Sequence, residues 1–354
     1  MMITKRILPG LLVFLLGLFL ITGCKQDKQK DGEEGDEPKT QEQTDSLTDS
    51  VDIAGLSEKI RENPRNPQLF EKRAELHAGE GNYKEAINDL EISLKLDSVS
   101  KSTYYSLIDY HMQLGQSGKA REVAEKCLEI HPRDKESMLR LAQIYYYVKD
   151  YNKALSYIKT IKEFNLQDAD TYFIQGLIYR EAGKPGLAIS AFQRTIEFDE
   201  DYIAAYNVLG QLLAESKDPL AQEYYLAGLR RAPDNLELHY NLGFYYQQSQ
   251  AIDSAMHHYN YIIDNIDFQH YGAHYNKGFI ALVYQDDYQT AVDEFSQALS
   301  IDSTAHKAYY NRGYARELMG EFEKARQDYN KALSIRENYE LAIQGLNSLD
   351  QKMQ

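Results

Sequence analysis

The chain of 354 residues lacks tryptophan altogether and is poor in cysteine and proline. Because it contains 29 tyrosines and 12 phenylalanines, its large aromatic packing positions must be filled mainly by Tyr and Phe. The 39 Lys and Arg residues against 54 Asp and Glu residues leave a net charge of −15. We therefore expect no nucleic-acid partner, since contacts to phosphates need a basic surface.

Catalytic motifs are missing as well. The sequence has no Gly-rich phosphate loop, nucleophile elbow, His-Glu-x-x-His motif or Cys-x-x-Cys pair. Four histidines (His257, His258, His270 and His274) cluster near one junction, but a metal site would need three or four converging ligands with orienting partners. We expect that His274 replaces a packing aromatic and that the other three lie on the surface. No catalytic residue, metal or cofactor is expected.

The sequence has only one long apolar run, at residues 7–21, which follows Lys5 and Arg6. It is short for a membrane span and typical of a secretory signal. The run ends in ITGC (21–24), which resembles the lipobox of bacterial lipoproteins. This resemblance implies cleavage before Cys24 and lipidation of Cys24, with palmitate among the acyl chains that anchor it durably. The alternative is an ordinary signal peptide or anchor in which Cys24 is coincidental.

Cysteine usage agrees with lipidation. Once Cys24 carries lipid, Cys127 is the single remaining thiol and no intramolecular disulfide can form. Cys127 falls at a small-residue core position, where we expect a buried, inert thiol.

Residues 25–50 hold four lysines, nine acidic residues and one bulky apolar side chain, Leu47. Such a segment cannot bury enough surface to fold, so we expect a disordered tether. Lys25 differs from the Asp that favours inner-membrane retention in enterobacterial lipoproteins, which favours the outer membrane of the cell envelope. The acidic tract resembles the surface-export signals of Bacteroidetes lipoproteins, and both a periplasmic and a surface-facing location stay open.

The rest of the chain is punctuated by alanines at nearly constant spacing. The gaps between them are 34, 34, 34, 33, 34, 36 and 34 residues, for Ala86, Ala120, Ala154, Ala188, Ala221, Ala255, Ala291 and Ala325. A fixed period in this range indicates a helical repeat array. With each alanine at position 20, position 8 is mostly small and position 24 mostly bulky, and glycines recur at position 15.

These positions resemble the tetratricopeptide repeat (TPR) family. The sequences NLGFYY (241–246) and NRGYAR (311–316) follow its first-helix pattern, and DYNKAL (150–155) and EFEKAR (321–326) follow its second-helix opening. The family's Trp position holds Phe70, Tyr104, Met138, Tyr172, Tyr206, His239, His274 and Tyr309. The resemblance implies an all-α, right-handed superhelical solenoid of about eight helix-turn-helix units with helical caps at both ends.

This interpretation divides the chain into a signal peptide (1–23), a lipidated Cys24 with its tether (24–50) and an N-terminal capping half-repeat (51–66). Eight units then span 67–339 (67–100, 101–134, 135–168, 169–202, 203–235, 236–270, 271–305 and 306–339), followed by a C-terminal capping helix (340–354). One residue is missing near Pro219 and one is extra near Asp286 and Asp287, in turns where length changes cost little. Only 15 residues follow Tyr339, so we expect no catalytic domain after the array.

In this family, positions 5, 9 and 12 of each first helix line the concave groove, and position 6 here adds a ladder of asparagines. The last three units are the richest in aromatics. Amides that donate and accept, together with rigid Tyr rings, suit an extended peptide or an inserted helix. We expect the groove residues to be Tyr240, Asn241, Phe244, Tyr275, Asn276, Phe279, Tyr310, Asn311 and Tyr314. The alternative is that this stripe only packs neighbouring repeats.

A carboxylate-clamp variant of the family is not expected, because Glu71 and Glu75 stand where clamp residues would be. We expect the double variant Tyr275→Ala and Tyr310→Ala to weaken partner capture without changing helicity. The sequence thus favours a non-enzymatic, membrane-anchored scaffold that binds other envelope proteins. The alternative is a cell-surface lipoprotein that captures carbohydrate or nutrients.

Overall fold

The computed structural model describes residues 52–353, and this part of the chain is helical throughout, without a strand. It divides into two compact units, one ending at Gly183 and the other beginning at Lys184, called here the N-terminal unit and the C-terminal unit. None of the described helices is long and apolar enough to cross a membrane. The all-α class expected from the sequence is confirmed.

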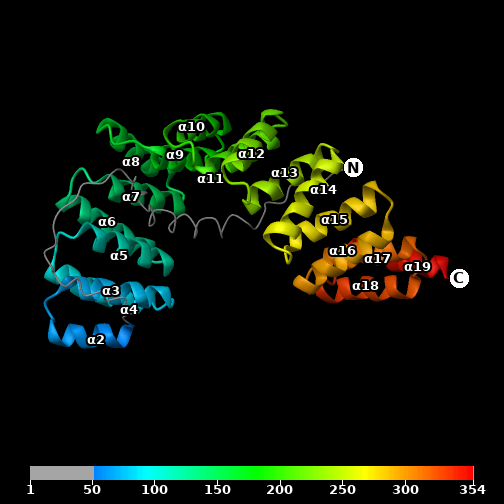
Figure 1. The fold of residues 1–354 in the computed structure, drawn as a ribbon, viewed down its shortest axis with the longest axis horizontal. Helices are drawn as coiled ribbons and strands as arrows, with labels where there is room; N and C mark the ends of the chain where they lie inside the picture. Colours follow the sequence, from blue (N-terminus) through cyan, green and yellow to red (C-terminus); the bar gives the residue numbers. More distant parts are fainter. Residues whose placement is uncertain (1–51, 354) are drawn as a thin grey trace, which may run out of the picture. The chain divides into compact units, whose positions relative to one another are not determined.

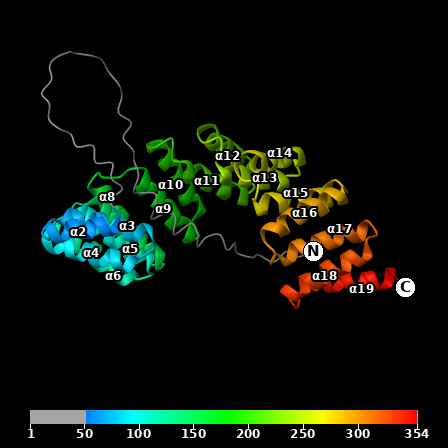
Figure 2. The same ribbon diagram turned by 60° about the horizontal axis from the view of Figure 1, so that its bottom comes forward.

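Within each unit, helices that follow one another in the chain pack side by side (Figures 1 and 2). The N-terminal unit contains α2 (Ile53–Glu62), α3 (Pro67–Gly79), α4 (Tyr83–Leu96), α5 (Lys101–Gln113), α6 (Ser117–Ile130), α7 (Lys135–Tyr147), α8 (Tyr151–Glu163) and α9 (Ala169–Glu181). The C-terminal unit contains α10 (Pro185–Phe198), α11 (Ile203–Glu215), α12 (Leu220–Arg231), α13 (Leu236–Gln248), α14 (Ile252–Tyr261), η2 (Ile262–Ile266), α15 (Tyr271–Tyr284), α16 (Tyr288–Ile301), α17 (His306–Leu318), α18 (Phe322–Ile335) and α19 (Glu340–Lys352).

Helix starts are set by side chains that accept from the first free backbone N–H groups. Asp134 accepts from Ser137 N at 2.9 Å, Asn235 from Leu238 N at 2.9 Å, and Asp287 from Thr290 N at 3.1 Å. Asp168 and Thr171 form a reciprocal capping box at the start of α9. These caps satisfy donors that no helical carbonyl can reach.

Helix pairs are joined by a turn with one residue in the left-handed region. The residues recur with the period of the repeat, four of them glycines and four not: Gly81, Gly115, Lys149, Gly183, Lys217, Gln250, Asp286 and Gly320. The sequence pattern located helix breaks at the four glycines of position 15. The structure shows that the same turn forms at Lys149, Lys217, Gln250 and Asp286, although a side chain in this region costs energy that glycine avoids.

The 36-residue gap between Ala255 and Ala291 contains two separate insertions. In the turn before α16, Asp287 N bonds to Ala281 O, six residues back, whereas the equivalent Gln116 N and Asp150 N bond five residues back. This is the extra residue expected near Asp287. The second extra residue was not predicted from the sequence. It lies in the π-helical segment η2, where Asp267 N bonds to Ile262 O, five residues back.

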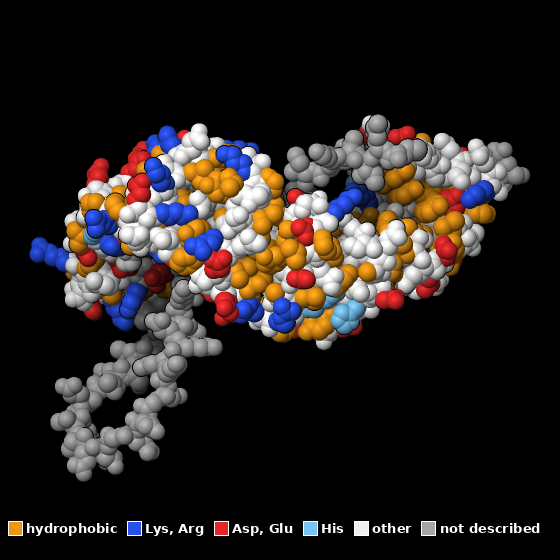
Figure 3. Space-filling view, turned by 90° about the horizontal axis from the view of Figure 1, so that it is seen from above, with side chains coloured by type: hydrophobic (Ala, Val, Ile, Leu, Met, Phe, Trp, Pro, Cys, Tyr) orange, Lys and Arg blue, Asp and Glu red, His pale blue; other side chains and the backbone are white. Residues whose placement is uncertain are grey.

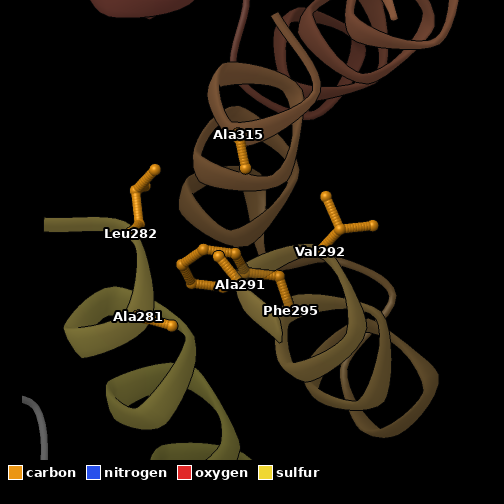
Figure 4. Packing of buried hydrophobic residues seen from close by; sticks show 6 residues of the cluster. All are labelled: Ala281, Leu282, Ala291, Val292, Phe295 and Ala315. Carbon is orange, nitrogen blue, oxygen red and sulfur yellow. The ribbon is translucent and has the colours of Figure 1, made fainter. Parts of the chain in front are cut away.

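The core lies between paired helices, where a small residue of the first helix meets an aromatic ring of the second. Phe295 of α16 projects between α15 and α17, against Ala281, Ala291 and Ala315 (Figure 4). A Cβ added to Gly278 would lie 3.0 Å from this ring, and one added to Gly210 would lie 2.4 Å from that of Tyr225. Close helix approach therefore depends on the glycines of position 8.

Candidate functional site

The candidate site lies on the first helices of the last repeats, all in the C-terminal unit. The helices α11, α13, α15 and α17 contact one another in succession, so their outward residues form a continuous surface. We call the nine expected groove residues on α13, α15 and α17 the first-helix face. The structure brings them together as three equivalent sets, one from each helix.

The asparagines of this face bond to the preceding repeat. The Nδ2 of Asn241 donates to Asn207 Oδ1 at 2.8 Å, and that of Asn311 donates to the Tyr275 hydroxyl at 3.0 Å. Asn276 donates to Tyr240 at 3.3 Å and to Tyr259 at 3.1 Å. Each amide NH₂ therefore holds two first helices together. Within residues 52–353, no hydrogen bond ends on the Oδ1 atom of Asn241 or Asn311, so these oxygens are available to accept from a ligand.

The tyrosines at position 5 are half-buried and belong as much to the core as to the face. Tyr240 lies 6.0 Å from Tyr259, Tyr275 lies 5.6 Å from Phe295, and Tyr310 lies 5.7 Å from Tyr329, measured between ring centroids. Desolvation raises the pKa of all three phenols, to about 12 for Tyr310. They stay neutral near pH 7. Truncating Tyr275 and Tyr310 would thus remove core contacts together with any ligand contact.

The aromatics at position 9 are more accessible. Phe244 is 43% exposed and Tyr314 is 40% exposed, while Phe279 between them is half-buried. Tyr314 stacks on Tyr310 with centroids 6.3 Å apart. On the side of the molecule drawn in Figure 3, hydrophobic side chains lie between charged ones of both signs. Among the rings of this face, Phe244 and Tyr314 would therefore lose the most hydrating water when a partner binds.

Buried ion pairs fix the helices behind this face. The guanidinium of Arg312 contacts Asp328 through two nitrogens, at 3.0 and 2.7 Å, and Ser296 through the third at 3.0 Å. Arg73, Asp89 and Ser57 repeat the arrangement in the N-terminal unit with the same spacing of 16 residues. Such bidentate pairs orient the two helices that they join.

In the N-terminal unit, a charged network links α5 and α7 at the corresponding face. The Tyr105 hydroxyl contacts both oxygens of Asp134 at 2.8 Å. Arg140 lies 4.7 Å from the Tyr105 ring centroid and contacts Asp109 and Glu136. Polar groups here satisfy one another, so the C-terminal unit offers the better apolar surface.

The histidines differ from the expectation. His258 was expected on the surface but is buried, because its position on α14 faces α13, where its Nδ1 lies 2.9 Å from His239 Nδ1. His270 caps α15 by accepting from Ala273 N. His274 takes an aromatic packing position, as expected, and His239 does so too. Within residues 52–353, no three His, Cys, Asp or Glu side chains converge as metal ligands.

The structure describes one of the two cysteines. Cys127 is buried, as expected, and burial raises the pKa of its thiol, which keeps it protonated and unreactive. Cys24, the expected lipidation site, lies outside the described residues, as do the signal peptide and the tether.

Comparison with known proteins identifies the repeats. Tetratricopeptide repeat family models match residues 101–160, 139–203 and 306–339. The chain carries tetratricopeptide repeats. A TPR repeat-containing protein of Methanocaldococcus jannaschii is 23% identical in an alignment of 245 residues that covers 64% of this chain and 43% of that protein. A TPR repeat-containing protein of Bacillus subtilis is 20% identical over 46% of this chain and 39% of its own length. The chain thus spans about two fifths of these curated relatives.

Solved structures agree on the fold. The C-terminal part of a TPR protein from Cytophaga hutchinsonii is 18% identical, with a TM-score of 0.57 over 68% of this chain and 98% of that one. The Cut9–Hcn1 structure has a TM-score of 0.51 at 16% identity, over 84% of this chain and 58% of that one.

One further sequence relative is an enzyme. A glycosyltransferase of Giardia intestinalis, named for transfer of N-acetylglucosamine to peptides, is 28% identical over 172 residues, but the match covers only 11% of that enzyme. TPR arrays generally mediate protein–protein interactions.

Proposed function

We propose that this protein is a non-enzymatic scaffold of the bacterial cell envelope, lipid-anchored to the outer membrane through Cys24. Its first-helix face binds a peptide segment or helix of another envelope protein. The observation that carries the binding part is the combination of exposed rings, Phe244 and Tyr314, with the available Oδ1 atoms of Asn241 and Asn311. Rings supply contact area and the oxygens accept peptide N–H groups.

Anchoring complements a face of this kind. A tethered scaffold and a partner in the same membrane compartment meet at high effective concentration, so moderate affinity suffices. The support for the anchor is the ITGC sequence at the end of the apolar run, with the acidic residues 25–50 as a spacer. Labelled palmitate should enter the wild-type protein and be absent from Cys24→Ala, which should leave the membrane fraction. Equal labelling of Cys24→Ala would reject the anchor.

The binding part is tested by photo-crosslinking in cells. A benzoyl-phenylalanine placed at position 244 should crosslink to a partner protein. The same group at position 268, where Phe268 is 71% exposed in the turn before α15, should not. The double variant Phe244→Ala and Tyr314→Ala should lose partner capture with unchanged helicity, because both rings are exposed. Equal crosslinking from positions 244 and 268 would contradict binding at this face.

A further inference from the structure

One edge of the first-helix face ends in an exposed group of aromatic and acidic side chains. This turn patch consists of Phe279 and Tyr284 at the end of α15, Asp286 and Asp287 in the following turn, Tyr288 of α16 and Tyr314 of α17. Tyr284 is 42% exposed, and both aspartates are exposed. Two of its members, Phe279 and Tyr314, are expected groove residues, and Asp286 occupies the repeated left-handed position.

Contacts hold the patch together. The ring centroids of Phe279 and Tyr284 lie 6.4 Å apart, and the Tyr288 hydroxyl donates to Asp286 Oδ1 at 3.2 Å. Phe279 and Tyr288 pack against one core cluster, and this cluster includes Ala315 of α17 (Figure 4). Tyr314, the residue before Ala315, interacts electrostatically with Tyr288. The patch therefore rests on a rigid base formed by α15, α16 and α17.

Acidic side chains outnumber basic ones in the segment of the chain that carries most of the patch. Between Asp234 and Asp302 the chain has ten acidic side chains and a single basic one, Lys277, whose Nζ contacts Glu294 at 2.6 Å. On α17, Arg312 and Arg316 are both engaged by Asp328. Hydrogen bonds from Thr290 lower the pKa of Asp287, so it is ionised near neutral pH.

No cation of the described chain lies over a ring of the patch, whereas Arg140 and Lys162 cover rings in the N-terminal unit. Exposed aromatic faces beside carboxylates attract Lys and Arg side chains through cation–π and ionic contacts. The apolar side chains Val283 and Leu318 nearby, 50% and 40% exposed, add hydrophobic area. A partner surface that complements this patch is therefore amphipathic and basic.

Resting on the proposed scaffold function, we propose that the turn patch selects a basic amphipathic helix of the partner protein, whose Lys or Arg side chains contact Tyr284, Tyr314, Asp286 and Asp287. A second copy of this chain would bring acidic groups against acidic groups, which is unfavourable. An acidic partner segment is disfavoured for the same reason.

The test uses the full chain and two labelled 14-residue peptides, one of Leu and Lys in amphipathic helical order and one with Glu in place of every Lys. Fluorescence anisotropy should show binding of the Lys peptide that weakens with salt, and much weaker binding of the Glu peptide. Asp286→Asn with Asp287→Asn should weaken Lys-peptide binding by roughly fourfold to 25-fold, since each of the two exposed contacts contributes a factor of about 2 to 5. Asn keeps the left-handed turn and the helix cap.

Control variants remove equal charge, or a single exposed ring, elsewhere. Asp264→Asn with Asp302→Asn changes two acidic groups at the distal helix ends; Asp302 follows α16, about 21 Å along the helix from Asp287. Tyr147→Ala removes a ring of similar exposure from the N-terminal unit. Both controls should bind like the wild type, while Tyr284→Ala with Tyr314→Ala should lose about tenfold in affinity, by the same exposed-contact factors.

Equal binding of the two peptides, or equal losses in the Asp286/Asp287 variant and its control, would overturn the basic-helix proposal. If position 244 still crosslinks to a partner, the scaffold proposal stands without it. If position 244 captures nothing and neither peptide binds, both proposals fall. A crosslink from position 284 to a second copy, or to residues 1–23 of the same chain, would also overturn the proposal.

Discussion

A shared hydrogen bond lets tyrosine and histidine occupy the same fourth position of the first helices. The Tyr104 and Tyr206 hydroxyls donate to carbonyls six residues upstream, at 3.2 and 3.0 Å. The Nε2 atoms of His239 and His274 meet the equivalent carbonyls of Pro233 and Phe268, at 2.8 and 3.0 Å. Histidine can replace Tyr here because both place a donor at the same point. The sequence shows the substitution but not this shared bond.

The bond of His239 Nε2 to a carbonyl fixes the state of its neighbour. A carbonyl oxygen can only accept a hydrogen bond, so Nε2 of His239 carries the proton. Neutral His239 then has a lone pair at Nδ1, which accepts a hydrogen bond from His258 Nδ1. Burial, the neighbouring histidine and His257 lower the pKa of His258 to about 4, and burial also lowers that of His239. The pair is therefore stable only while both rings are neutral.

Acid should weaken the C-terminal unit through this pair. The unfolded chain binds a proton near pH 6.5 and the folded one near pH 4, so the stabilisation is present above pH 6.5 and is lost as the pH falls toward 4. We expect the free energy of unfolding to drop by roughly 3 kcal/mol from His258. Urea denaturation between pH 7.5 and 4 measures this loss.

The matched variant is His258→Asn, whose Nδ2 can replace the Nδ1 donor without titrating. Its stability should depend less on pH than that of the wild type. His257→Asn removes only the smallest of the three causes that lower the pKa of His258, so it should stay close to the wild type. Parallel pH curves for His258→Asn and wild type would show that the pair does not titrate as described.

At the scale of elements, the distance between paired helices depends on glycine facing a buried ring. Gly210 of α11 faces Tyr225 of α12, and a Cβ there would lie 2.4 Å from the ring, which is only 2% exposed and has little room to move. Gly118 of α6 is also helical, but nothing lies within 4 Å of an added Cβ. The repeat period predicts the first glycine's role, but only packing distinguishes it from the second.

Gly210→Ala should destabilise the protein by about 1–3 kcal/mol, because the extra methyl group forces apart two tightly packed helices. Gly118→Ala should be neutral or slightly stabilising, since alanine favours the helix and meets no neighbour. Thermal and urea denaturation of the two variants compare these effects directly. Equal shifts in both variants would contradict the packing argument.

At the scale of the whole molecule, each repeat buries its apolar face mainly against the next element of the array, and α19 covers that face of α18. In α19, Leu349 and Ala342 are fully buried against Tyr329 and Ala332, while Leu341 is 44% exposed. Glu317 of α17 ties this helix down by accepting from Ser348 at 2.7 Å and Lys352 at 2.9 Å.

Leu349→Ala should therefore cost about 2–4 kcal/mol and loosen the end of the array. Hydrogen exchange should become faster in α17, α18 and α19 and change little in α10 and α11, since repeats couple mainly to their neighbours. Leu341→Ala in the same helix should have little effect on exchange. Uniform loss of protection across the C-terminal unit would contradict this nearest-neighbour coupling.

The sequence by itself determined the repeat, the all-α class and the small and bulky core positions, because helix geometry imposes a local period that survives in residue sizes. It could not determine which face residues are free. That depends on bonds between side chains about 34 residues apart, such as Asn241 with Asn207, which only the packing of adjacent repeats creates. Only the tertiary structure therefore shows that His258 lies in the core and that Phe244, Tyr284 and Tyr314 stay exposed. It also shows that the asparagine NH₂ groups form hydrogen bonds between helices.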